Sequence, residues 1–149
     1  MHVEVRHVEA RPTLVVAAVV TWAQFPVLWR AMSDEVWACL RAADIDRGAR
    51  NVMLYHDDRP WVEVGVLAPG TVPLTGRVVA SALPVGRVAT ARHRGPYGLL
   101  GDTHEAVHAW CRQHGEQPTR TRWEIYAPHD DDPEEIWVEV SWLLLSAAT

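Results

Sequence analysis

One segment of the 149-residue chain carries the His-Glu-x-x-His pattern of zinc metallopeptidases, from His104 to His108. On a helix the two histidines lie on the same side, where they could hold Zn²⁺ while Glu105 activates a zinc-bound water. The helical phase argues against this chemistry, because Thr103 and Val107 lie on the buried stripe while Glu105 and His108 turn toward solvent. No third ligand follows at metallopeptidase spacing, so a zinc hydrolase is a remote alternative. We expect no metal site and no cofactor.

A second candidate is Glu124, in the aromatic segment Trp123-Glu124-Ile125-Tyr126. Side chains alternate along a strand, so Glu124 and Tyr126 share one side and Trp123 and Ile125 share the other. We expect Trp123 and Ile125 to face the helices, which leaves Glu124 and Tyr126 in a cleft on the opposite face. A carboxylate among aromatic rings needs a cationic partner, and a ligand cation could supply it with help from cation–π attraction. The same carboxylate could act as a general acid or base, and a solvated strand glutamate is the plain alternative.

The elements that would position these residues occur twice along the chain. Each half contains a strand, an amphipathic helix and a β-hairpin. The sequence Trp-Val-Glu-Val begins the last strand of both halves, at Trp61 and at Trp137, while Tyr55 and Tyr126 close the strand before it. The expected elements are a strand at 14–21, a helix from Pro26 with Leu28, Met32, Val36, Cys39 and Leu40 on its buried face, strands at 51–56 and 61–67, a strand at 86–93, a helix from Leu100 to Gly115, and strands at 123–127 and 136–142.

This order predicts an α+β fold built by tandem duplication of a βαββ unit with pseudo-twofold symmetry. We expect an antiparallel sheet covered by two helices on one face, with a ligand cleft on the other face. Residues 1–149 form a single domain in this interpretation, with pseudo-repeats at about 1–68 and 85–145. The joining segment is rich in proline and glycine and could contribute a short strand at 77–81.

The order and spacing of several segments resemble the GyrI-like effector-binding domain. These segments are His93-Arg94-Gly95-Pro96-Tyr97, a helix that ends in Trp110 and Gly115, the segment Trp123 to Tyr126, and an Asp-rich turn before the final strand. The family is the ligand-sensing half of AraC-type and MerR-type transcription regulators, and it also occurs as stand-alone small proteins. The resemblance covers nearly the whole chain and implies a duplicated βαββ fold with a ligand pocket between the halves. No residues remain for a helix-turn-helix.

The resemblance also implies a role for Glu124. In multidrug-sensing relatives, a glutamate at the matching position sits in an aromatic pocket and pairs with cationic, lipophilic ligands. Some stand-alone members hydrolyse strained, DNA-alkylating natural products of the cyclopropane type, again with a central pocket glutamate. Recognition of a lipophilic, cationic or aromatic small molecule is therefore the favoured function, and hydrolysis with Glu124 as the catalytic residue is the alternative. Protein-inhibitor binding, as in gyrase-inhibitor relatives, is a third class.

Duplication extends the candidate site into the first half of the chain. The counterparts of Glu124 and Tyr126 there are Met53 and Tyr55, and Tyr97 could cap the opening or simply pack at the strand–helix corner. Trp61 and Trp137 start strands beside the hairpins and could form aromatic walls. The predicted ligand-binding residues are Glu124, Tyr126, Tyr97, Tyr55, Met53, Trp61 and Trp137.

Composition limits the possible partners. The net charge is -5, so phosphate backbones are repelled and direct nucleic-acid binding is not expected. All 14 basic residues are arginine. The longest strongly apolar run, at 14–20, is too short to cross a membrane, and no secretory signal is visible, so we expect a cytoplasmic protein. The two cysteines, Cys39 and Cys111, are expected to be buried free thiols. A small-molecule ligand is the expected partner, with a separate regulator or gyrase as a possible protein partner.

Overall fold

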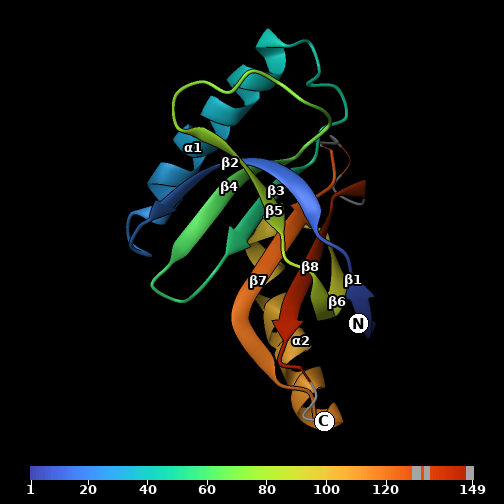
Figure 1. The fold of residues 1–149 in the computed structure, drawn as a ribbon. Coiled ribbons are helices and arrows are strands. Elements are labelled where there is room, and N and C mark those ends of the chain that lie inside the picture. The colour runs from blue at the N-terminus through green and yellow to red at the C-terminus, as the bar shows by residue number, and fades with distance from the viewer. Residues whose placement is uncertain (129–131, 133–134, 147–149) are drawn as a thin grey trace.

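The computed structural model describes residues 1–128, 132 and 135–146. Within these residues the protein has one eight-stranded sheet and two α-helices, which confirms the α+β class (Figure 1). The strands are β1 (Val3–Val8), β2 (Arg11–Val19), β3 (Asn51–Tyr55), β4 (Trp61–Leu67), β5 (Val78–Leu83), β6 (Gly86–Arg94), β7 (Pro118–Tyr126) and β8 (Trp137–Leu144). The helices are α1 (Phe25–Ala42) and α2 (Leu100–His114), and the 3₁₀ turn η1 (Tyr97–Leu99) leads into α2. No helix in the described ranges is long and apolar enough to span a membrane.

The strand order shows the duplication directly. The sheet runs β1-β6-β8-β7-β3-β4-β2-β5, and every neighbouring pair is antiparallel. Exchanging β1 with β5, β2 with β6, β3 with β7 and β4 with β8 reproduces the same order. The pseudo-twofold axis therefore passes between β3 and β7, where Met53 pairs with Glu124. The sequence did not predict β1, which pairs with β6 just as β5 pairs with β2, so each half adds its first strand to the other half.

Both helices cover the same face of the sheet. Met32, Val36 and Leu40 of α1 are buried against strands β2 and β4, and Val107 and Cys111 of α2 are buried against β6 and β8. Pro26 lies in the first turn of α1, where a missing backbone N–H breaks no helical hydrogen bond. The stripe of α1 differs in detail from the prediction, because Leu28 is exposed and Phe25 is buried. Gly115 ends α2 as predicted, in a left-handed conformation, and both cysteines are buried free thiols.

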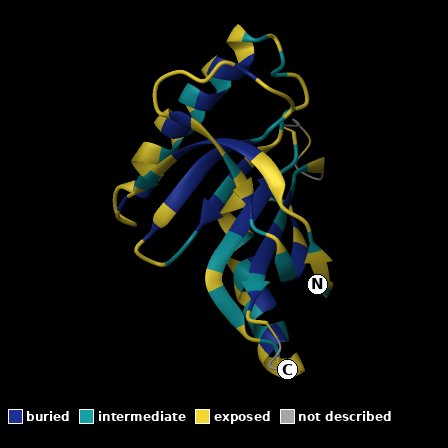
Figure 2. Ribbon diagram, viewed as in Figure 1, coloured by how far each residue is buried: buried dark blue, intermediate teal, exposed yellow. Residues whose placement is uncertain are grey.

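The sheet curves strongly, so its face opposite the helices is concave. Only Glu9 and Ala10 connect β1 to β2, although these strands are first and seventh in the sheet, and the link between β5 and β6 is equally short (Figure 1). The two edges must therefore bend toward each other on this face. A buried cluster fills the resulting concave side, and the inner strands are dark in Figure 2. It consists of Val52, Leu54, Leu83, Val88, Trp123 and Ile125.

This curvature corrects the predicted position of the cleft. Trp123 and Ile125 belong to the cluster on the concave side, so they face away from the helices rather than toward them. Glu124 and Tyr126, at the alternate positions of β7, consequently lie on the helix-covered face. The prediction erred because strand alternation groups residues into two faces without indicating which face the helices cover.

Candidate functional site

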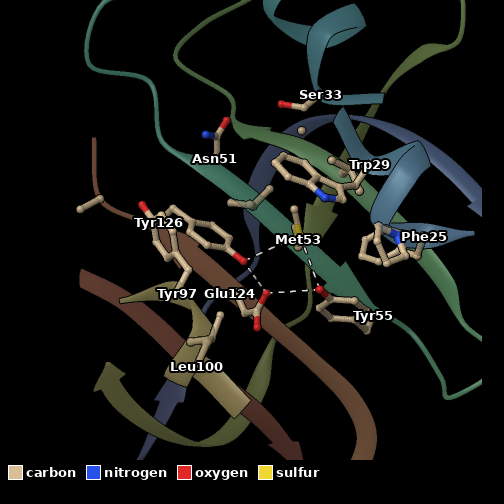
Figure 3. A pocket seen from close by; sticks show the side chains of 15 residues that line it. Phe25, Trp29, Ser33, Asn51, Met53, Tyr55, Tyr97, Leu100, Glu124 and Tyr126 are labelled. Carbon is tan, nitrogen blue, oxygen red and sulfur yellow. Dashed lines mark hydrogen bonds between the residues drawn. The ribbon is translucent and has the colours of Figure 1, made fainter. Parts of the chain in front are cut away.

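A cavity of about 470 Å³ opens on the helix-covered face between α1 and the start of α2 (Figure 3). Its volume suits a small organic ligand. The floor is formed by the central strands β3 and β7 at the pseudo-twofold axis. The walls come from Phe25, Trp29 and Ser33 of α1 on one side, and from Tyr97 and Leu100 on the other. The space between the two helices, and not the face away from them, is therefore the candidate site.

Glu124 lies on the floor of this pocket and is only 4% exposed. Its Oε1 accepts hydrogen bonds from the hydroxyl of Tyr126 at 2.7 Å and from that of Tyr55 at 3.3 Å (Figure 3). Its Oε2 accepts a hydrogen bond from Nε2 of His104 at 2.6 Å. The two tyrosines occupy equivalent positions in the two halves and converge on one carboxylate, because Glu124 sits beside the axis. Three donors from three different elements thus fix its orientation.

Within the described part of the chain, no arginine is bonded to this carboxylate, whose three donors are the hydroxyls of two tyrosines and the imidazole of His104. Burial raises the pKa of both Tyr55 and Tyr126, and the charge of Glu124 raises these pKa values further, so both hydroxyls stay protonated donors. Arg122, two residues earlier on β7, lies over the Tyr55 ring at 4.9 Å and donates to Asp58 at 2.9 Å. None of the described residues that line the pocket is basic. The floor therefore holds a carboxyl group among aromatic and aliphatic walls.

The geometry of the His-Glu-x-x-His segment differs from that of a zinc site. Both ring nitrogens of His104 are occupied, Nε2 by Glu124 and Nδ1 by the indole N–H of Trp142 at 2.9 Å. The ring of His108 packs edge-on against Trp142, with centroids 4.1 Å apart. No group of three potential metal ligands occurs among the described residues. The geometry of the two histidines therefore does not fit the zinc alternative.

Five of the seven predicted site residues line the pocket, namely Met53, Tyr55, Tyr97, Glu124 and Tyr126. Their role in ligand binding stays a prediction. Tyr97 lies half-exposed at the pocket wall and packs edge-on against Tyr126, with centroids 5.9 Å apart.

The structure places the other two predicted residues, Trp61 and Trp137, outside this pocket. Val62 and Val138, the next residue in each strand, face the helices, so alternation turns both tryptophans to the opposite face. There Trp61 stacks on His56, and the guanidinium of Arg92 lies 4.1 Å from the Trp137 ring centroid.

Sequence reasoning missed the contribution of α1 and of the His104–Trp142 pair. Phe25, Trp29 and Ser33 follow one another at four-residue steps, so helical periodicity could have placed them on one face. No comparable signal joins His104 on α2 to Trp142 on β8, because their contact depends on how α2 lies across the sheet.

A family model described as the GyrI-like small molecule binding domain matches residues 1–144. The chain belongs to this family. No curated protein matches the chain. The GyrI-like fold is also seen in solved structures. The EcmrR C-terminal domain superimposes with a TM-score of 0.70 at 17% identity, over 98% of this chain and 98% of that chain.

Two further solved structures share this fold. SAV2435, solved bound to tetraphenylphosphonium, has a TM-score of 0.64 at 11% identity, over 97% of this chain and 94% of that chain. A hydrolase encoded by lin2189 from Listeria innocua has a TM-score of 0.61 at 12% identity, over 96% and 91% of the two chains. At these identities the likeness shows the shared fold alone.

Proposed function

We propose that this GyrI-like chain binds a lipophilic organic cation with aromatic groups in the pocket between α1 and α2, with Glu124 as its charge partner. The observation that carries the proposal is a buried carboxylate, 4% exposed, that is held by three donors in an aromatic pocket. A buried charge is costly unless it is compensated, and hydrogen bonds from neutral groups do not cancel it. A ligand cation would complete this compensation.

The pocket walls favour a ligand with ring systems. Phe25 and Trp29 lie on one side and Tyr97 and Tyr126 on the other, so aromatic groups of a ligand can stack against both walls (Figure 3). The faces of tyrosine and tryptophan rings also attract cations directly. Tetraphenylphosphonium, the ligand in the SAV2435 structure, combines these properties and is a suitable probe.

The test is isothermal titration calorimetry with tetraphenylphosphonium and with neutral triphenylphosphine oxide, a close aromatic analogue. We expect saturable one-site binding of the cation and clearly weaker binding of the neutral compound, because only the cation compensates Glu124. Equal affinity for both compounds, or no binding of either, would contradict the proposal. A regulator or gyrase is the candidate protein partner.

Hydrolysis of an electrophilic natural product is the second candidate function. It is favoured by the chain of hydrogen bonds from Trp142 through His104 to Glu124, because such a chain orients a carboxylate for proton transfer. Glu124 would then deprotonate a water molecule that attacks the bound ligand. Mass spectrometry of ligand recovered after incubation separates the two functions: an intact ligand supports binding alone, and a hydrated product that requires Glu124 supports catalysis.

A further inference from the structure

We infer that Trp142 and His104 are positioning residues that keep the pocket's negative charge uncancelled, because Trp142 holds His104 as a neutral donor to Glu124. This inference rests on the proposed binding of a cation at Glu124 and deepens it. It assigns a role to His104, the first residue of the His-Glu-x-x-His segment.

The hydrogen bonds define where the proton on His104 lies. The indole N–H of Trp142 can only donate, so Nδ1 of His104, 2.9 Å away, must accept with a free lone pair. A neutral imidazole carries one ring proton, which is then on Nε2 and is donated to Glu124 over 2.6 Å. The tautomer and the neutral state of His104 both follow from one donor on β8.

Several charged and titratable groups surround His104, and they act in opposite directions. Glu124 on β7 favours a second proton on the imidazole. Arg122, also on β7, has its guanidinium 5.2 Å from the Trp142 ring and opposes a second proton. His108, one turn along α2, also packs edge-on against Trp142, and the hydroxyl of Tyr126 is a neutral donor to the Glu124 carboxylate. The indole N–H decides the balance, because a second proton on Nδ1 would break the bond to Trp142.

The protonation state of His104 determines what a ligand meets. A doubly protonated His104 would form an ion pair with Glu124 and cancel its charge, so a ligand cation would lose its partner. The neutral Nε2–H donor orients the same carboxylate and leaves its charge for the ligand. Trp142 thus acts on ligand binding through His104, without lining the pocket itself.

The first experiment compares pH profiles of tetraphenylphosphonium binding for the wild type and Trp142→Phe. Phenylalanine keeps a ring against His108 but has no N–H, so Nδ1 of His104 becomes free to take up a proton. We expect wild-type affinity to stay level between about pH 8 and about pH 5.5, and the affinity of Trp142→Phe to fall about tenfold across the ordinary histidine pKa of about 6.5. Binding of triphenylphosphine oxide should not change with pH in either protein.

Two further variants separate this effect from a packing defect. Trp123→Phe shortens another buried tryptophan on the opposite face, and its pH profile should match that of the wild type. Adding His104→Gln to Trp142→Phe replaces the imidazole by an amide that donates but does not titrate, so the level profile should return. A level profile for Trp142→Phe alone, or an equally steep fall in the wild type, would overturn the inference.

A ligand-free measurement distinguishes failure of this inference from failure of the proposed function. Long-range ¹⁵N–¹H NMR spectra of histidine rings report which nitrogen is protonated, and His104→Gln assigns the signal. We expect the Nε2–H tautomer in the unliganded wild type at about pH 6, below the ordinary histidine pKa of about 6.5. An Nδ1–H or doubly protonated ring would refute the inference even if tetraphenylphosphonium binds. The expected tautomer without any binding would refute cation recognition alone.

Discussion

Replacing Glu124 by glutamine removes the charge from the pocket floor and keeps its shape. The carboxamide can accept the Nε2–H of His104 through its oxygen, and its NH₂ can donate to the hydroxyls of Tyr55 and Tyr126, which accept as well as donate. Each of these three contacts of residue 124 then keeps a donor and an acceptor, so we expect Glu124→Gln to fold. Its effect on ligands should come from the lost charge.

The size of the effect follows from Coulomb's law. A ligand cation in contact with the carboxylate would lie about 5 Å from its charge, and at an effective dielectric constant of about 20 the attraction is about 3 kcal/mol. Losing that interaction weakens binding of tetraphenylphosphonium by about a hundredfold, since about 1.4 kcal/mol corresponds to a factor of ten. Binding of neutral triphenylphosphine oxide should change by less than about threefold, because its contacts with the rings remain.

Calorimetric titration of both ligands against the wild type and Glu124→Gln measures these changes. Glu63→Gln is the matched control, because Glu63 is also a buried strand glutamate, 6% exposed, but lies on the face away from the pocket. Thermal melting of each variant shows whether the fold is intact. Unchanged affinity for the cation in Glu124→Gln, or an equal loss for both ligands, would refute the assignment of Glu124 as the charge partner.

Three further predictions concern titration and packing. Burial and the nearby Glu124 raise the pKa values of Tyr55 and Tyr126, so ultraviolet titration should show that these two of the three tyrosines stay protonated above pH 10.0 in the folded protein. Stability should fall above that pH, because the unfolded chain loses these protons and the folded chain keeps them. Burial lowers the pKa of His108 below 6.5, and the charge of Arg112 lowers it further. The unfolded chain therefore binds more protons, so stability falls as the pH drops through 6.5, and urea unfolding of His108→Gln should show a smaller fall. A Cβ at Gly65 would lie 1.9 Å from a backbone oxygen of β2, so Gly65→Ala should disrupt the pairing of β2 with β4. A Cβ at Gly101 would meet open space, so Gly101→Ala should raise the stability of α2 by up to about 1 kcal/mol. Circular dichroism melts compare the two variants.

Much of the architecture was predictable because it rests on local patterns. The repeated Trp-Val-Glu-Val segments and the equivalent Tyr55 and Tyr126 indicated the duplication, and the apolar spacing placed both helices within a few residues of their observed bounds. Strand β1 was not predicted, because only Val3 of its six residues is buried and its charged alternation does not distinguish an edge strand from a surface loop.

The candidate site was predictable only in part. Alternation along β7 correctly grouped Glu124 with Tyr126, and equivalence between the halves correctly added Met53 and Tyr55. The same reasoning failed for Trp61 and Trp137, because starting a strand beside a hairpin does not indicate the face to which a side chain points. These tryptophans follow the alternation of β4 and β8 to the side away from the helices.

The sequence by itself determined most of the elements and which residues share a face, because periods of 3.6 and 2 residues are properties of the local backbone. The tertiary structure decided which face is open to a ligand. The pairing of β1 with β6 and of β5 with β2 closes one side of the sheet, and the two helices leave a gap over the axis on the other side. Only that arrangement brings Tyr55, Tyr126 and His104 to one carboxylate and Trp142 to His104, since these contacts join residues far apart in the chain.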